Sequence, residues 1–157
     1  MIFITLGSQK FQFDRLLKEI DKLILKGDIK EEVFAQRGYS EYIPKNFKYK
    51  DFLNRDEFQE LMKSCDLVVT HGGTGAIVTA LKNSKKVVAV ARLSEYGEHV
   101  DDHQIDIVTQ FSSINYIIGI TDIEELENSI IEAKNKSFNK YVSNTNKIID
   151  IIEDFLK

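Results

Sequence analysis

Short apolar runs alternate along the chain with longer stretches in which apolar residues recur at helical spacing. Met1–Leu6 (MIFITL) is followed by Gly7 and Ser8, which is typical of a buried strand. The next stretch carries a single apolar stripe, which predicts a helix packed on a sheet. The stripe consists of Phe13, Leu16, Leu17, Ile20 and Ile24.

The middle of the chain repeats this alternation. Glu32–Gln36 and Phe47–Tyr49 have the composition of short strands. Asn54–Glu57 (NRDE) places a capping side chain three residues before a Glu, which predicts a helix start, and the helix should run to about Ser64.

A βαβ unit follows. Asp66–Thr70 (DLVVT) and Lys86–Ala91 (KVVAVA) read as central strands, and Thr74–Lys82 between them reads as a helix. Because the connection is a helix, the two strands should be parallel. This unit predicts a parallel sheet covered by helices on both faces.

The last third continues the pattern. We expect a polar loop over 92–101, a helix over Asp102–Phe111, a strand over Ile114–Gly119, and a second capping box at Thr121–Glu124. A final apolar stripe predicts a C-terminal helix, with Tyr141, Thr145, Ile148, Ile149, Ile152, Phe155 and Leu156 on it. The whole chain, 1–157, should therefore be one α/β domain built on a Rossmann-like, doubly wound parallel sheet.

Composition narrows the class of partner. With Lys+Arg 21 against Asp+Glu 25, the chain lacks the positive excess with which proteins displace counterions from nucleic acid, so we expect no nucleic-acid partner. No apolar run approaches the roughly 18–20 residues that span a bilayer, and the start turns polar too early for a signal peptide. We expect a cytoplasmic protein. The single cysteine, Cys65, lies at helical spacing with Phe58, Leu61 and Met62, which predicts core packing.

Asp66–Leu81 (DLVVTHGGTGAIVTAL) carries the most chemical information, because an apolar strand runs through HGGTG directly into a helix. Glycines there permit a tight turn and close approach of the backbone to a ligand, and the free N–H groups of a helix N-terminus attract an anion. We expect a phosphate or diphosphate, with the Thr74 hydroxyl and the His71 ring N–H as further donors. A plain strand-to-helix turn is the alternative.

Two common nucleotide motifs are absent from the sequence. A Walker A loop would need Lys and Ser or Thr after the last glycine, where Ala76 and Ile77 stand. The dinucleotide fingerprint is also missing, because Gly7 is followed by Ser, Gln and Lys.

A second polar segment, Glu95–Gln104 (EYGEHVDDHQ), follows the next predicted strand and should lie at the same sheet edge. Its carboxylates, imidazoles and amide can pair with sugar hydroxyls. A solvated charged loop is the plain alternative. The residues Glu95, His99, Asp102 and His103 are also types that bind metal, but they form no compact ligand motif, so we expect no metal.

Five segments in order resemble the carboxyl-terminal domain of glycosyltransferase family 28, the MurG-like enzymes with the GT-B fold. They are ITLGSQKFQFDRLL, VFAQRGYSEY, FKYKDFL, DLVVTHGGTGAIVTAL and EYGEHVDDHQ, and they cover roughly residues 1–120. More narrowly, the chain is similar to the PssE-like subunits of bacterial capsule and exopolysaccharide synthesis. It is also similar to the catalytic subunit of the eukaryotic transferase that adds the second N-acetylglucosamine to the dolichol-linked oligosaccharide.

The resemblance implies a function. The chain would be the donor-binding lobe of a GT-B hexosyltransferase, moving a sugar from a UDP-sugar to a lipid-linked acceptor. A membrane-anchored subunit would supply the acceptor-binding lobe and recruit the chain to the inner face of the membrane. The transfer would be inverting and would use no metal or other cofactor.

The resemblance also assigns residues. The diphosphate site would comprise His71, Gly72, Gly73, Thr74 and Gly75. The donor sugar would meet His103 and Gln104, and the base would lie beside Phe52 and Leu53. Candidates for the base that accepts the acceptor's proton are Glu95, Glu98 and His99, while His71 would stabilise the leaving diphosphate.

One position departs from the family pattern. Eight residues after His71 the family usually has a Glu that binds the ribose hydroxyls, and this chain has Thr79. Thr79 offers one hydroxyl in place of a charged bidentate acceptor. A non-catalytic nucleotide-sugar binding or regulatory module is therefore an alternative function. A nucleotide-sugar epimerase is a third, but such enzymes carry both lobes in one chain.

Overall fold

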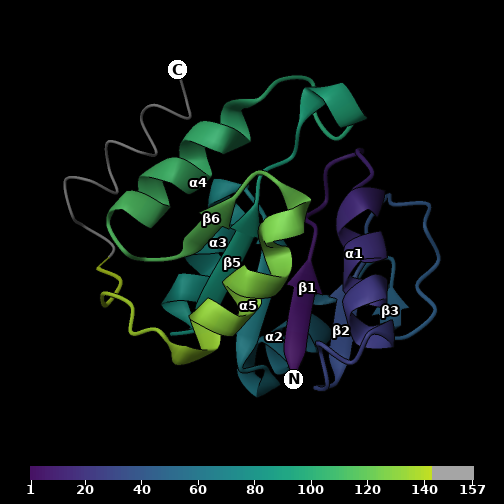
Figure 1. Cartoon of the computed structure of the whole chain (residues 1–157), viewed down its shortest axis with the longest axis horizontal. Helices are drawn as coiled ribbons and strands as arrows, with labels where there is room; N and C mark the ends of the chain where they lie inside the picture. Colours follow the sequence, from purple (N-terminus) through teal and green to yellow (C-terminus); the bar gives the residue numbers. More distant parts are fainter. Residues whose placement is uncertain (143–157) are drawn as a thin grey trace.

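The computed structural model describes residues 1–142 of the chain. Over this range six parallel strands form one sheet in the order β3-β2-β1-β4-β5-β6, with helices on both faces (Figure 1). The strands are β1 Ile2–Thr5, β2 Val33–Gln36, β3 Lys48–Lys50, β4 Leu67–His71, β5 Lys86–Val90 and β6 Ile118–Ile120. The helices are α1 Asp14–Leu25, α2 Arg55–Ser64, α3 Thr74–Lys82, α4 His103–Ser113 and α5 Leu126–Asn135. The predicted doubly wound α/β sheet is confirmed.

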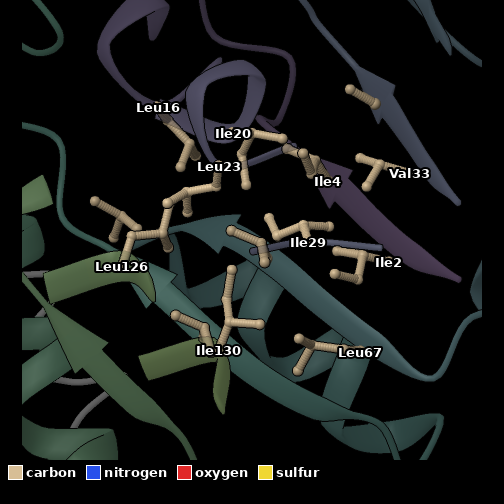
Figure 2. Close-up of a cluster of buried hydrophobic side chains, with 14 of the residues drawn as sticks. Ile2, Ile4, Leu16, Ile20, Leu23, Ile29, Val33, Leu67, Leu126 and Ile130 are labelled. Atoms are coloured by element: carbon tan, nitrogen blue, oxygen red, sulfur yellow. The ribbon is translucent and has the colours of Figure 1, made fainter. Parts of the chain in front are cut away.

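The two faces of the sheet carry separate hydrophobic cores, because successive strand residues point to opposite faces. Ile2 and Ile4 of β1 pack in the core beneath α1 and α5, whereas Phe3 between them packs in the core beneath α2, α3 and α4. Figure 2 shows the first of these cores, with side chains of α1 and α5 meeting those of the strands. Phe13, Leu16, Leu17 and Ile20 of the stripe predicted for the first helix are buried, whereas Ile24 is only partly buried and Leu23 is buried beside it.

Local signals placed several elements correctly. Thr74–Lys82 has the predicted bounds, and the predicted strands on either side of it become β4 and β5. The capping box of α2 is present: Asn54 Oδ1 accepts from the N–H of Glu57 at 2.8 Å, and Glu57 Oε1 accepts from the N–H of Asn54 at 3.3 Å. Cys65 is buried at the end of α2, as its spacing predicted.

Two predicted boundaries after α4 are wrong. The strand expected over Ile114–Gly119 is shorter and later, because α4 continues to Ser113 and Asn115 then adopts a left-handed conformation with φ 56°. The second cap is made by Asp122, whose side chain accepts from the N–H of Glu124 at 3.0 Å, and not by Thr121. It opens a single 3-10 turn, η2 Ile123–Glu125, before α5.

The expected C-terminal helix lies, apart from Tyr141, outside the described residues. Tyr141 packs edge-to-face on Tyr116, with ring centroids 5.7 Å apart. Among residues 1–142, no helix is long and apolar enough to cross a bilayer.

The strand order reverses at β1. This strand pairs with β2 on one side and with β4 on the other, so the chain winds outward in both directions from the centre of the sheet. In open parallel sheets, ligands bind beyond the carboxyl ends of the strands at such a reversal. The loops that follow β1 and β4 therefore occupy the position where a ligand is expected.

Candidate functional site

The N-terminus of α3 is open toward the carboxyl edge of the sheet. β4 ends at His71 and α3 begins at Thr74, so only two glycines separate strand from helix. Gly73 is the N-cap, and within residues 1–142 no side chain caps it. The first N–H groups of a helix have no acceptor inside the helix and lie at the positive end of its dipole. This terminus is therefore suited to hold an anion.

The imidazole of His71 is buried between two glycines. A Cβ built on Gly7 would lie 2.7 Å from its Nε2, and one built on Gly73 would lie 2.2 Å from its Cε1. Gly7 also has φ +73°, a conformation that L side chains rarely adopt. A Cβ on Gly75, by contrast, would meet nothing within 4 Å. Gly7 and Gly73 are thus required by the protein's own histidine, whereas Gly75 leaves open space for a ligand.

His71 is neutral at physiological pH. Burial, and then the positive charge of Arg92, lower its pKa from 6.5 to about 3. The backbone N–H of Gly73 donates to His71 Nδ1 at 3.1 Å, so the ring proton lies on Nε2, next to Gly7. The ring therefore acts as an uncharged N–H donor.

Two threonines of α3 border the same space. Thr74 Oγ1 is buried and meets no hydrogen-bond partner in the described part of the chain. A buried hydroxyl without a partner costs about 1–3 kcal/mol, and a phosphate oxygen would supply one. The hydroxyl of Thr79 donates to the carbonyl of Gly75 at 2.8 Å.

A cavity of about 480 Å³ joins these groups to the loops after β1 and β3. Six of the predicted site residues line it: Leu53, His71, Gly73, Thr74, Gly75 and Thr79. Predicted residues that do not line it are Phe52, Gly72, Glu95, Glu98, His99, His103 and Gln104. The structure thus brings together the expected phosphate loop, one of the two expected base contacts and the expected ribose position.

Sequence reasoning missed the opposite wall of this cavity. The missed residues include Thr5, Gly7, Ser8, Gln9, Gln36, Asn54, Arg55 and Gln59. A signal was present: Gly7–Gln9 directly follows the first buried strand, and Asn54 opens a helix after the third. Both segments lie at carboxyl ends of parallel strands, where the placement rule used for HGGTG applies equally.

Gln104 does not face the cavity. Its side-chain Oε1 accepts from the backbone N–H of Gly72 at 2.9 Å and of Arg92 at 3.0 Å. Its Nε2 lies 3.2 Å from His71 Nδ1, and the residue is 4% exposed. In this structure the amide of Gln104, which the resemblance assigned to the donor sugar, is buried and engaged by the protein's own backbone.

The loop after β5 is anchored by buried charges. Arg15 Nε lies 3.0 Å from Glu98 Oε2, and Glu98 Oε1 also accepts from the N–H of Leu93 at 3.0 Å. Arg92 is buried as well and donates to several backbone carbonyls, including that of Leu6 at 2.6 Å. Glu98 is fully buried, so its carboxylate cannot reach an acceptor hydroxyl. This removes Glu98 from the candidates for the catalytic base, although residues 94–97 of the same polar loop are exposed.

The two remaining histidines lie further along the same loop. His99 stacks on Phe11, with ring centroids 5.3 Å apart, and its Nδ1 lies 3.1 Å from Asp101 Oδ1. His103 opens α4, and its side chain is 69% exposed. Within residues 1–142, no group of three or more His, Cys, Asp or Glu side chains is arranged to hold a metal ion.

Phe52 forms an exposed aromatic pair. Its ring meets that of Tyr39 edge-to-face, with centroids 5.2 Å apart, and both residues are nearly half exposed. The pair belongs to the loops after β2 and β3, and the adjacent Leu53 lines the cavity. Exposed aromatic rings are platforms on which nucleobases stack.

A larger hollow, of about 660 Å³, lies at the opposite edge of the sheet, where β5 begins. Lysines dominate its wall, namely Lys82, Lys85, Lys86, Lys136 and Lys140. It contains none of the predicted site residues and lies away from the carboxyl ends of the strands.

Known proteins are similar to this chain in sequence and in fold. The yeast Candida albicans protein UDP-N-acetylglucosamine transferase subunit ALG13 is 27% identical over 104 residues, which are 66% of this chain and 32% of that protein. This chain thus spans about a third of the length of that relative.

Solved structures with the same fold include the solution structure of ALG13, with TM-score 0.59 and 18% identity, which covers 96% of this chain and 93% of that one. The glycosyltransferase SnogD from Streptomyces nogalater has TM-score 0.58 and 15% identity, over 98% of this chain and 37% of that one. The fold is therefore that of a lobe found in larger glycosyltransferases. The sequence model of the glycosyltransferase family 28 C-terminal domain matches residues 1–155, and the chain accordingly belongs to this family.

Proposed function

We propose that this chain is the donor-binding subunit of a two-part glycosyltransferase that transfers a sugar from a UDP-sugar to a lipid-linked acceptor. One observation carries the proposal: the cavity at the strand reversal unites an uncapped helix N-terminus, an unpartnered buried hydroxyl on Thr74 and a neutral N–H donor on His71. Three kinds of donor that converge on one space match the oxygens of a diphosphate.

In this proposal the same groups assist the chemistry. Negative charge grows on the diphosphate as the sugar leaves, and preorganised donors stabilise that charge without rearranging. The first N–H groups of α3, the Thr74 hydroxyl and the Nε2–H of His71 are such donors. They meet the charge of the leaving group directly, so the proposed transfer needs no metal cofactor.

The rest of the nucleotide would lie along the same edge. The uracil would stack beside Phe52 and Leu53, and the ribose would lie near Thr79, whose side chain borders the cavity. The exposed His103 is left to meet the donor sugar. Thr79 offers one hydroxyl, already directed at a backbone carbonyl, so the ribose would be held more weakly than by a carboxylate.

The acceptor would reach the site from a membrane-anchored partner lobe. The relative from Candida albicans is named a transferase subunit, which supports a partner here. His99 is our choice for the base that takes the acceptor's proton. Its Nδ1 lies 3.1 Å from Asp101 Oδ1 and 3.4 Å from the backbone N–H of Asp101, and a ring that donates from Nδ1 to that carboxylate would leave Nε2 to accept. Capsule or exopolysaccharide synthesis is the setting that fits the resemblance.

Calorimetric titration tests the donor site. UDP-N-acetylglucosamine should bind the isolated chain weakly, and excess chelator should leave that affinity unchanged. Thr74→Val removes the unpartnered hydroxyl and should weaken binding about ten-fold or more, since a hydrogen bond to a charged group contributes roughly 1.5–3 kcal/mol. Thr109→Val removes an exposed hydroxyl of α4 and is the matched control. Equal affinities for the two variants would count against the site.

Turnover separates the enzyme from its alternative. The presence of Thr79 where the family usually has a Glu also favours a second function, that of a non-catalytic module that binds a nucleotide sugar. Membranes that contain the partner lobe should convert UDP-N-acetylglucosamine only after this chain is added, and His99→Ala should lower the turnover number. Binding without turnover in the presence of the partner would favour the non-catalytic module.

A further inference from the structure

A buried arginine follows β5 at the carboxyl edge of the sheet, the same edge from which the loop after β1 leaves (Figure 1). Arg92 is the second residue after β5 and is 1% exposed. Its guanidinium donates to four backbone carbonyls, those of Leu6 at 2.6 Å, Gln12 at 3.1 Å, and Phe11 and Glu98 at 3.3 Å. Burial lowers the pKa of Arg92 to about 10, so the side chain is still charged at neutral pH.

Three of these carbonyls belong to one loop. Leu6 begins the loop after β1, and Phe11 and Gln12 end it shortly before α1. The side chain of Arg92 therefore bridges the two ends of this loop. The middle of the loop, Gly7–Gln9, forms part of the cavity wall. The shape of that wall thus depends on two ends that a single guanidinium holds together.

The middle of the loop projects into solvent. Ser8, Gln9 and Lys10 are exposed, and the N–H of Phe11 donates to the carbonyl of Gln9 at 2.8 Å. Exposed loops with few buried contacts are the most mobile parts of a protein. Fixed ends restrict such a loop, because a short segment between two anchored points has few conformations left.

The planar guanidinium suits this task. Its N–H groups diverge in a rigid fork, so Nη2 donates to Leu6 while Nη1 donates to Phe11 and Gln12. Cζ of Arg92 also lies 5.0 Å from the centroid of the Phe13 ring, which supports the guanidinium from one face. Lysine carries its charge on one rotating ammonium, so it cannot reproduce this fork.

The charge of Arg92 hydrogen bonds to no carboxylate among the described residues. The carboxylate of Glu98 is bound by Arg15, whose Nε and Nη2 each donate to it at 3.0 Å. Two largely buried guanidinium groups thus share one carboxylate, and within residues 1–142 no Asp or Glu lines the cavity. The charge of Arg92 is felt at the cavity, since it lowers the pKa of the lining residue His71. The excess positive charge favours an anion there.

We propose that Arg92 is a positioning residue for the donor: it holds both ends of the loop after β1 and so keeps the Gly7–Gln9 wall in place before a ligand arrives. Arg92 acts through this loop, because it is buried and does not line the cavity. The attachment of the loop rests on the contacts of Arg92 alone. The identity of the donor rests on the proposed function.

Nitrogen-15 relaxation of the free wild-type protein tests whether the wall is held. The backbone order parameters of Ser8, Gln9 and Lys10 should approach about 0.85, the value of rigid backbone, although these residues are exposed. Values below about 0.6, which mark flexible backbone, would overturn the proposal without any variant or ligand.

Arg92→Lys tests the cause. This change keeps the charge and removes the fork, so the order parameters of the same three residues should fall below about 0.6. Arg15→Lys is the matched control, because the hydrogen bonds of this neighbouring arginine go to Glu98, Ala91 and Thr121 and not to the loop after β1. The control should keep the wild-type order parameters. Unchanged order parameters in folded Arg92→Lys would overturn the positioning role.

Calorimetry gives the functional readout. The affinity of folded Arg92→Lys for UDP-N-acetylglucosamine should fall about ten-fold or more, because binding must then order several residues that Arg92 no longer fixes. Arg15→Lys should bind as wild type. In the presence of saturating ligand the loop of Arg92→Lys should regain the wild-type order parameters, which a general loss of stability would not produce.

The outcomes separate the two proposals. A flexible loop in Arg92→Lys together with wild-type affinity would show that the wall does not need to be preformed, and would overturn the role of Arg92 in donor binding. If UDP-N-acetylglucosamine binds no form of the protein, the proposed function fails, while the relaxation result still decides whether Arg92 holds the loop.

Discussion

Alanine at Gly75 should stabilise the protein and weaken its binding of the donor. Gly75 is the second residue of α3, and a Cβ there would meet nothing within 4 Å. Glycine is less favourable than alanine by about 1 kcal/mol inside a helix, and we take about half of that for an exposed first turn. Gly75→Ala should therefore raise the free energy of unfolding by about 0.5 kcal/mol and the melting temperature by about 1–2 °C.

The effect on binding should have the opposite sign. The open space beside Gly75 is where the diphosphate would approach the N-terminus of α3. A methyl group there would displace at least one charge-assisted hydrogen bond, which contributes roughly 1.5–3 kcal/mol. The affinity for UDP-N-acetylglucosamine should fall about ten-fold or more.

Gly73→Ala is the contrasting variant. Its Cβ would lie 2.2 Å from Cε1 of the buried His71, so the ring must move. Overpacking of this kind costs about 1–3 kcal/mol, so this variant should lose both stability and affinity. Urea denaturation gives the free energy of unfolding of each variant, and calorimetry gives its affinity for UDP-N-acetylglucosamine. A Gly75→Ala protein that is more stable and binds the donor as well as wild type would refute the diphosphate site.

Three further predictions concern other residues of the site and its support. Glu98→Gln leaves the charge of the largely buried Arg15 without its carboxylate partner, so the free energy of unfolding should fall by about 3–5 kcal/mol in urea denaturation. A loss below about 1 kcal/mol would show that the backbone carbonyls around Arg15 are enough to stabilise its charge. Thr79→Glu should strengthen UDP binding about five-fold, roughly 1 kcal/mol, by offering a carboxylate to the ribose, and weaker binding by calorimetry would move the ribose elsewhere. The pKa of His71 is about 3 in the folded protein, whereas its ordinary value, which applies to the unfolded chain, is 6.5. As the pH drops below 6.5 the unfolded chain therefore binds the proton first, and the free energy of unfolding should fall. The slope from this group is at most about 1.4 kcal/mol per pH unit, and His71→Asn should remove it; equal slopes for the two proteins down to about pH 5 would contradict a buried neutral His71.

Interactions between near neighbours in the chain were predictable from the sequence. The strand, glycine loop and helix of HGGTG were placed correctly because periodicity, glycine and the helix start act within a few residues. The capping box at Asn54 was predictable for the same reason. The family pattern assigned Thr79 to the ribose position, the helical repeat supported that placement beside the loop, and Thr79 lines the cavity.

Interactions between distant parts of the chain needed the tertiary structure. Nothing local to Glu98 shows that Arg15, 83 residues away, removes it from solvent. The amide of Gln104 suited sugar hydroxyls in the sequence. Only the structure shows that Gly72 and Arg92, at the ends of β4 and β5, donate their backbone N–H groups to its oxygen. The sequence by itself determined where the HGGTG loop and its helix lie. The packing of the strands decided which other segments border the cavity and which polar side chains are free for a ligand, because most buried donors and acceptors are satisfied within the protein.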